Sequence, residues 1–285
     1  MKVLVLGVTG MLGSAVYRVF SQSKKHDVWG TLRSDGGKRH FPIENQTNLV
    51  SGIDVLDQDS LISVLNKVKP DVVINCVGLI KQLADANDPL SALPINAILP
   101  HRLAHLCELL DARLIHVSTD CVFSGSAGMY TEEDISDASD LYGKSKFIGE
   151  LHDQPNAITL RTSIIGHELG SQFALVDWFL AQEGVVKGYS KAIFSGLPTV
   201  ELARVIRDYV LPKPNLNGLY HVSVKPIDKL SLLKLVAKMY GKDIQINPDD
   251  ALQIDRSLDS TRFCQATGYI PLEWPELIQN MYEQR

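Results

Sequence analysis

The sequence predicts an α/β fold: a doubly wound parallel sheet with a second, smaller α/β lobe. Apolar runs of strand length alternate with amphipathic stretches of helix length through about the first 165 residues. A glycine-rich turn follows the first apolar run directly. With 285 residues and a hydrophobic content of 45%, the chain can bury a core of ordinary size.

The predicted strands are short apolar runs bounded by turn residues. In the main sheet they cover residues 3–6, 28–32, 52–55, 71–76, 113–117 and 157–160. Amphipathic helices fill the intervals, notably from about residue 89 to 110 and from about 141 to 151. Because a crossover follows each strand, we expect right-handed connections and Rossmann-type topology.

Beyond residue 165 the pattern loosens, because glycines and prolines separate shorter elements. Here we predict helices near 200–209 and 230–239 and a strand near 218–222. The expected organisation is a domain of residues 1–165, to which 195–222 returns, and a smaller lobe of residues 166–194 and 223–285. Since no flexible linker joins them, we expect the lobe to pack tightly and form one wall of a cleft.

Composition favours a small-molecule partner. The net charge of −5 and the pI near 5.9 provide no basic field for nucleic acid or an anionic membrane. The four cysteines lack the spacing of a metal site, and no apolar stretch approaches the roughly 18 residues of a membrane span. We therefore expect a cytoplasmic protein with reduced thiols, no metal and no membrane segment.

Gly7, Gly10 and Gly13 follow the first strand and open the first helix. Such a turn lets backbone N–H groups, including those of Thr9, Met11 and Leu12, approach a pyrophosphate at the positive end of the helix. The spacing is GxxGxxG, and three glycines alone are also compatible with a simple tight turn. Their position after a strand favours the dinucleotide site.

The end of the second strand carries Arg33 where an acid would bind the ribose 2′-hydroxyl of NAD. Arg33 can instead bind the 2′-phosphate of NADP, and Lys38 and Arg39 can contribute further positive charge there. The alternative is a solvated loop arginine. We predict NADP, with NADPH preferred over NADH.

Tyr142 and Lys146 are four residues apart, so both project from one face of a helix. A lysine ammonium there can lower the pKa of the phenol and make it a usable proton donor. Tyr209 and Lys213 share the spacing, but Pro212 interrupts that helix. Thr119, at the end of an apolar strand, supplies a second hydroxyl for a substrate carbonyl, and this favours Tyr142 over Tyr209 as the catalytic tyrosine. The alternative is that Thr119 only caps a turn.

Three segments together resemble the extended short-chain dehydrogenase/reductase family, and most closely its dTDP-4-dehydrorhamnose reductase branch. They are the glycine turn, Ser118-Thr119-Asp120-Cys121 with the following Val122-Phe123-Ser124-Gly125, and Tyr142-Gly143-Lys144-Ser145-Lys146. Leu160-Arg161-Thr162-Ser163 also resembles this branch, and the likeness covers essentially the whole chain.

The resemblance implies a catalytic triad of Thr119, Tyr142 and Lys146, with Lys146 also holding the nicotinamide ribose. It implies an NADP-binding domain, a substrate lobe, a nucleotide-sugar substrate and a possible homodimer formed through the long helices. Further implied cofactor contacts come from Asp54 and Val55 at the adenine and from Asn75, Cys76 and Val77 on the strand edge. Asn75 can equally brace the sheet, and Asn96 is expected to be structural.

Two departures from the branch concern the sugar pocket. Cys121 replaces the usual tyrosine and Ile164 the frequent tryptophan, so the particular hexose stays open. Implied substrate contacts are Asp120, Cys121, Ser163 and Ile164, with Lys81 as a further candidate.

The resemblance implies reduction of the C4 carbonyl of a nucleotide-linked 4-keto-6-deoxyhexose. A dehydratase is disfavoured because Cys121 stands where that enzyme needs an acid. An epimerase stays open, although its usual NAD preference fits Arg33 poorly. The chain also resembles the NADP-binding regulatory subunit of methionine adenosyltransferase, which needs no turnover.

Overall fold

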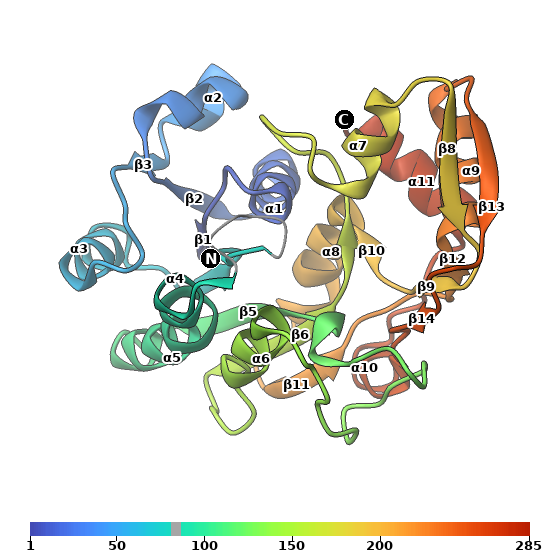
Figure 1. Cartoon of the computed structure of the whole chain (residues 1–285). Helices are drawn as coiled ribbons and strands as arrows, with labels where there is room; N and C mark the ends of the chain where they lie inside the picture. Colours follow the sequence, from blue (N-terminus) through green and yellow to red (C-terminus); the bar gives the residue numbers. More distant parts are fainter. Residues whose placement is uncertain (81–86) are drawn as a thin grey trace.

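The computed structural model describes residues 1–80 and 87–285 and has a seven-stranded parallel sheet at its centre (Figure 1). The strand order is β11-β6-β5-β4-β1-β2-β3, and each neighbouring pair is parallel. The strands are β1 Lys2–Leu6, β2 Asp27–Leu32, β3 Leu49–Ser51, β4 Val72–Asn75, β5 Arg113–Thr119, β6 Ala157–Thr162 and β11 Gly218–His221. This topology confirms the predicted doubly wound sheet.

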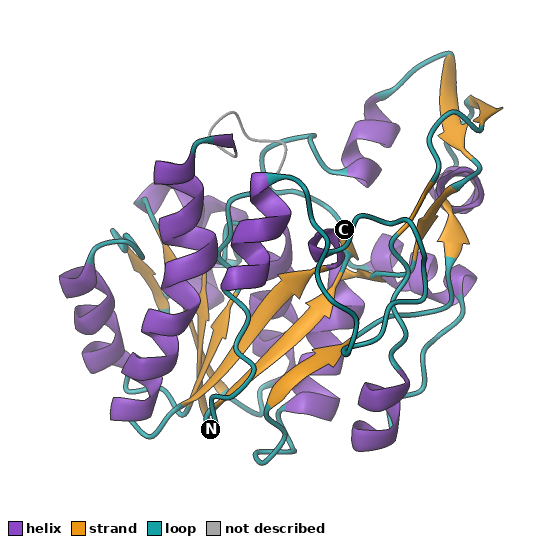
Figure 2. Ribbon diagram, turned by 60° about the horizontal axis from the view of Figure 1, so that its bottom comes forward, coloured by secondary structure: helices purple, strands orange, loops and turns teal. Residues whose placement is uncertain are grey.

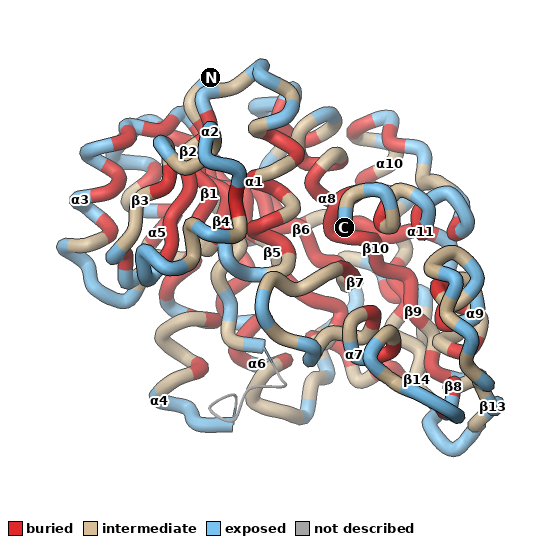
Figure 3. Tube along the Cα trace, turned by 90° about the horizontal axis from the view of Figure 1, so that it is seen from above, coloured by how far each residue is buried: buried red, intermediate tan, exposed pale blue. Residues whose placement is uncertain are grey.

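Helices cover both faces of the sheet (Figure 2), and the side chains of β1 show why. Val3 and Val5 belong to one buried core, whereas Leu4 and Leu6 belong to the core on the opposite face. Successive side chains of a strand point to opposite faces, so a continuous apolar run requires cover on both. Buried residues therefore concentrate along the central strands (Figure 3).

The helices around the main sheet lie in two groups. The core that contains Val3 and Val5 includes α1 Met11–Ser23 and α8 Thr199–Val205. The opposite core includes α3 Gln58–Val68 and α5 Leu99–Leu109. The remaining helices of this part are the short α2 Ile43–Gln46, α4 Pro89–Ala92 and α6 Leu141–Ile148.

The predicted helix from about 89 to 110 forms, but its middle is π-helical over Leu93–Ile98. Pro94 and Pro100 explain the change, because a proline has no N–H to donate to the carbonyl four residues before it. The N–H of Leu99 instead bonds to the carbonyl of Pro94, five residues back. Asn96 lies in this wide turn and is buried.

The predicted strand at 52–55 is wrong. The third strand is Leu49–Ser51, which pairs with Gly30–Leu32 of β2. Gly52 has φ +78°, a left-handed conformation that ends the strand, and Ile53 is buried beyond it. The apolar residues after Gly52 thus fill the core from a loop.

Apart from α8 and β11, which belong to the main part of the fold, the chain after residue 162 builds small sheets beside the main one (Figure 1). β7 Ile164–Ile165 pairs with β10 Leu197–Pro198; β9 Ala192–Phe194 lies between β12 Ile227–Asp228 and β14 Ile254–Asp255; β8 Val185–Tyr189 pairs with β13 Gln245–Asp249. The predicted helices near 200–209 and 230–239 are present, the latter as α9 Lys229–Tyr240. An amphipathic helical stretch expected around Trp178 is present as α7 Leu175–Ala181, whereas sequence reasoning missed α10 Thr261–Thr267 and α11 Trp274–Glu283.

Within residues 1–80 and 87–285, no helix combines the length and apolar character needed to cross a membrane.

Candidate active site

The candidate site lies at the carboxyl ends of the parallel strands, where the strand order reverses between β1 and β4. Open α/β sheets bind ligands at this switch point. The turns after β1, β4 and β5 all open on this edge. The sequence motifs on these turns therefore meet in one region of the fold.

The glycine turn after β1 has the geometry of a phosphate cradle. Gly7 has φ +79°, and a β-carbon there would lie 2.8 Å from Cγ2 of Val77. A β-carbon at Gly13 would overlap the carbonyl oxygen of Gly7, so α1 packs directly onto the turn. Within the described residues, no side chain caps the N-terminus of α1. These N–H groups are the kind that bind pyrophosphate.

The loop after β4 connects the glycine turn to Lys146. Its Val77 lies beside Gly7, and a β-carbon built at Gly78 would lie 3.9 Å from Nζ of Lys146. Asn96 binds both backbone groups of Leu79, the residue after Gly78. Its side chain accepts the Leu79 N–H at 2.9 Å and donates to the Leu79 carbonyl at 3.1 Å. Asn96 is thus structural, as expected, but it also fixes a wall of the site.

Asn75 engages both ends of its amide within the protein. Its Oδ1 accepts the Val77 N–H at 3.1 Å, and its Nδ2 lies 3.1 Å from Nδ1 of His116 on β5. The bracing role proposed for a buried amide is therefore present. Cys76 follows directly, and burial raises the pKa of its thiol to about 12, so it is no nucleophile at neutral pH.

The loop after β2 faces the glycine turn. A β-carbon at Gly37 would lie 2.8 Å from the Thr9 side chain. Arg33 is exposed on this loop, while Lys38 pairs with Asp35 at 2.7 Å. Asp54 is exposed and Val55 is half-buried in the loop after β3, rather than on a strand.

Thr119 and Tyr142 meet at the end of β5. Asp140 caps α6 by accepting the Gly143 N–H at 2.8 Å, and this sets where the helix that carries Tyr142 begins. The Thr119 side chain accepts the Cys121 N–H at 3.2 Å and hydrogen bonds with the Tyr142 phenol. Thr119 therefore also caps a turn, as its alternative reading required. Two hydroxyls 23 positions apart in sequence now converge on one point.

Lys146 is buried, and its Nζ donates to the Val117 carbonyl at 2.9 Å. Burial lowers the pKa of this ammonium to about 8, whereas the negative charge of Glu150 raises it. Burial raises the pKa of Tyr142, and the Thr119 hydroxyl lowers it only in part. The expectation that Lys146 brings the phenol pKa down is therefore not met in this structure, because desolvation outweighs the other influences.

The residues expected to contact the substrate differ in their burial and in their partners. Asp120 is buried, which raises the pKa of its carboxyl, and it hydrogen bonds with Ser163. Cys121 lies near Tyr142, and burial raises the pKa of its thiol to about 11, so it is uncharged at neutral pH. Ile164 is half-buried and pairs with Leu197 in the β7–β10 ladder. Lys81 lies outside the described residues.

Sequence reasoning missed Arg256, which reaches this corner from the far end of the chain. Its Nε donates to the Phe123 carbonyl at 2.7 Å, and its Nη1 donates to Sγ of Cys121 at 3.5 Å. It also lowers the pKa of Asp120, against the effect of burial. A sequence separation of 135 residues from Cys121 leaves no local pattern by which to find it.

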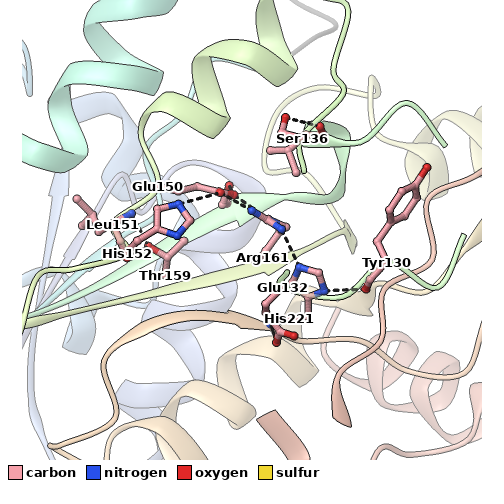
Figure 4. A network of polar contacts seen from close by, with 11 residues as sticks. Tyr130, Glu132, Ser136, Glu150, Leu151, His152, Thr159, Arg161 and His221 are labelled. Carbon is pink, nitrogen blue, oxygen red and sulfur yellow. Dashed lines mark hydrogen bonds and ion pairs between the residues drawn. The ribbon is translucent and has the colours of Figure 1, made fainter. Parts of the chain in front are cut away.

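Sequence reasoning also missed a buried polar network behind the corner (Figure 4). Glu150 accepts Ser118 Oγ at 2.6 Å and the two ends of the Arg161 guanidinium at 2.9 and 2.5 Å. Arg161 continues to Nε2 of His221 at 2.8 Å, and Nδ1 of His221 lies 2.9 Å from the Tyr130 carbonyl. The sequence signal for this network is Arg161, a charged residue within the otherwise apolar strand β6.

In the part of the chain that the structure describes, no three His, Cys, Asp or Glu side chains group as a metal site would require.

Comparison with known proteins shows a family match along nearly the whole chain. The family model described as RmlD substrate binding domain matches residues 1–283. Methionine adenosyltransferase 2 subunit beta of Mus musculus is 33% identical over 59% of this chain, but the match spans only 48% of that protein. The Danio rerio protein of the same name is 32% identical over 79% of this chain and 69% of its own length. dTDP-4-dehydrorhamnose reductase of Aggregatibacter actinomycetemcomitans is 24% identical over 98% of both chains.

Solved structures share the fold at low identity. A Bacillus anthracis dTDP-4-dehydrorhamnose reductase in complex with NADP superposes with a TM-score of 0.80 at 20% identity, covering 99% of both chains. A dTDP-glucose 4,6-dehydratase from the same organism, in complex with NAD, gives 0.77 at 17% identity over 100% of this chain and 97% of that one. These structural neighbours bind NAD or NADP.

Proposed function

Because this chain belongs to the RmlD substrate binding domain family of extended short-chain dehydrogenases/reductases, we propose that it reduces a sugar carbonyl with NADPH. The substrate we propose is a nucleotide-linked 4-keto-6-deoxyhexose, reduced at C4. The convergence of the Thr119 and Tyr142 hydroxyls, with Lys146 one helical turn away, carries this proposal. Two hydroxyl donors suit an oxygen that becomes negative during reduction.

The residues present fit a dinucleotide. The glycine turn and the N-terminus of α1 would hold its pyrophosphate, and Lys146 beside Gly78 would hold the nicotinamide ribose. When bound, NADPH supplies a hydride to the carbonyl carbon. Thr119 orients the carbonyl oxygen, and the Tyr142 phenol gives it a proton, so that the product is an alcohol. Burial keeps this phenol protonated at neutral pH, which is the form that a donor requires.

We propose a preference for NADP that depends on Arg33. Replacing Arg33 with alanine should raise the Kd for NADPH about tenfold, the loss of one charge-assisted contact to a phosphate, and leave the Kd for NADH unchanged. Fluorescence titration of both cofactors measures this. Lys67→Ala, which removes an exposed charge on α3, is the control. Equal weakening of both cofactors by Arg33→Ala would assign Arg33 a role other than phosphate recognition.

We propose that Arg256 contacts the sugar nucleotide from the C-terminal part of the chain. Its fork of five N–H donors exceeds the two contacts that it makes to Phe123 and Cys121. Arg256→Met should raise the KM for the sugar nucleotide about tenfold, with the Kd for NADPH unchanged. Arg262→Met, at a half-exposed arginine that pairs with Glu133, is the control. An unaltered KM in Arg256→Met would remove Arg256 from the substrate site.

The test of the proposal is oxidation of NADPH by the purified chain in the presence of 4-keto-6-deoxyhexoses linked to dTDP, UDP, GDP or CDP. We expect turnover with at least one of them, and NMR of the product gives the configuration at C4. Turnover with none of the four would contradict the assignment.

A second candidate is a subunit that binds NADP and assists a methionine adenosyltransferase. It is favoured by the 33% identity to the subunit beta of that enzyme, over about half of that protein's length. Tight NADPH binding without oxidation by any sugar nucleotide would support it. An NAD-dependent epimerase is the weaker alternative, since Arg33 stands where NAD needs an acid.

We also propose a homodimer formed through the long helices. Ile98, Leu109 and Ile148 are exposed apolar residues of this region, with exposed fractions of 50%, 82% and 53%. Sedimentation of the purified chain measures the oligomeric state directly.

A further inference from the structure

Glu150 and Lys146 contact consecutive residues of one strand. Lys146 Nζ donates to the Val117 carbonyl at 2.9 Å, and the Glu150 carboxylate accepts Ser118 Oγ at 2.6 Å. Glu150 follows Lys146 by four residues, just past the end of α6, so the two side chains lie on the same face of the chain. Both are buried, with exposed fractions of 3% and 5%. A carboxylate and an ammonium therefore contact neighbouring residues of the strand that ends in Thr119.

The Glu150 carboxylate is held by two residues from neighbouring strands. Ser118 from β5 binds it, Arg161 from β6 forks onto both of its oxygens, and Arg161 is itself held by His221 from β11 (Figure 4). The Arg161 guanidinium also lies over the Phe123 ring, 5.0 Å from its centroid. A buried ion pair with this many partners has one geometry, because each group's remaining hydrogen bonds are satisfied.

We propose that Glu150 is a positioning residue for the catalytic corner: its fixed carboxylate supplies the negative charge that keeps Lys146 an ammonium. Arg161 and Ser118 hold that carboxylate in place. The inference rests on the proposed function only in that it gives Lys146 a catalytic role. The charge relation itself belongs to the folded chain, and it can be measured without any substrate.

The other titratable groups around Lys146 cannot replace Glu150. Burial, with a smaller contribution from the Lys146 charge, holds the pKa of His116 on β5 well below its usual value, so this imidazole is neutral. Tyr142 on α6 is a neutral phenol, because burial raises its pKa. The charge of Asp120, at the end of β5, acts on Cys121 and Tyr142. Against burial, which lowers the pKa of Lys146 to about 8, Glu150 is the charge that raises it.

The experiment is an NMR titration of the Lys146 side chain in the full-length protein, using ¹³C-labelled lysine and Lys146→Arg to assign the signal. Removing the negative charge favours the neutral amine, so Glu150→Gln should lower the Lys146 pKa by about one unit. Glu150→Asp keeps the charge, and Ser118→Ala keeps the charge while removing one hydrogen bond. Both should titrate close to the wild type.

An unchanged Lys146 pKa in folded Glu150→Gln would overturn the inference. So would a shift of the same size in Glu150→Asp or Ser118→Ala, since packing rather than charge would then be the cause. If Glu150→Gln does not fold, Glu150→Gln/Arg161→Gln removes both charges of the buried pair, and a downward shift of the Lys146 pKa is still expected, because Glu150 is the member of the pair that acts on Lys146. A chain that shows this shift but reduces no sugar nucleotide would contradict the proposed function and leave the role of the Glu150 charge standing.

Discussion

Tyr142→Phe should lower kcat/KM for sugar-nucleotide reduction by about 10²- to 10⁴-fold, the usual contribution of a general acid. The substitution removes one oxygen atom from a ring that packs at the end of β5, so the fold and the glycine turn should stay unchanged. We therefore expect the Kd for NADPH, measured by fluorescence, to stay close to the wild-type value. Steady-state oxidation of NADPH with the best sugar nucleotide gives the rate.

Tyr209→Phe is a matched control for this experiment. Tyr209 begins the second YxxxK spacing, but it packs against the edge of the Tyr269 ring, with 5.2 Å between the ring centroids. Its helix ends at Val210, ahead of Pro212. We expect wild-type kinetics from Tyr209→Phe. Near-normal turnover by folded Tyr142→Phe would remove Tyr142 from the mechanism.

Arg161→Met should lower the free energy of unfolding by about 3–5 kcal/mol, because it leaves the buried Glu150 carboxylate without its partner. Arg161 is 1% exposed and Glu150 is 3% exposed. Urea denaturation of the purified variant measures the loss. A loss of this size is a large part of the stability of an ordinary domain, so a lower yield of folded protein is also expected.

Two variants separate charge pairing from packing. Arg207→Met breaks an ion pair with Asp208 whose side chains are 23% and 43% exposed, and it should cost about 0–1 kcal/mol. Glu150→Leu/Arg161→Met removes both buried charges and should recover most of the stability that Arg161→Met loses. If Arg161→Met cost no more than Arg207→Met, the buried pair would contribute nothing to the fold.

Strand positions were predictable wherever a short apolar run stands between turn residues. β1 and β6 satisfy this condition, and their predicted and observed residues agree within a few positions. β3 does not satisfy it, because Gly52 divides an apolar stretch and the strand precedes the glycine rather than following it. The helix α10 has only seven residues, too few for the helical period to stand out.

The candidate site was predictable as far as it consists of local motifs. The glycine turn, Thr119 and Tyr142 each carry a recognisable neighbourhood in sequence, and the fold brings the last two together. Arg256 carries none, because its partners lie on a loop more than 130 residues earlier. The pKa of Tyr142 was also beyond reach, since desolvation depends on how tightly the folded chain surrounds the ring. The division into two lobes stays a prediction.

Because β11 pairs with β6, β6 lacks its outer neighbour for part of the time during which the chain is synthesised. β6 is complete at Thr162, yet its outer neighbour ends at His221, after β7, α7, β8, β9, β10 and α8 have been made. Until then the nascent chain presents an unpaired, apolar strand edge of the kind that joins other chains. Arg161 on that edge also lacks its His221 partner during this interval. A ribosome-bound chain stalled before residue 218 should therefore need chaperone protection that a chain extended beyond residue 221 no longer requires.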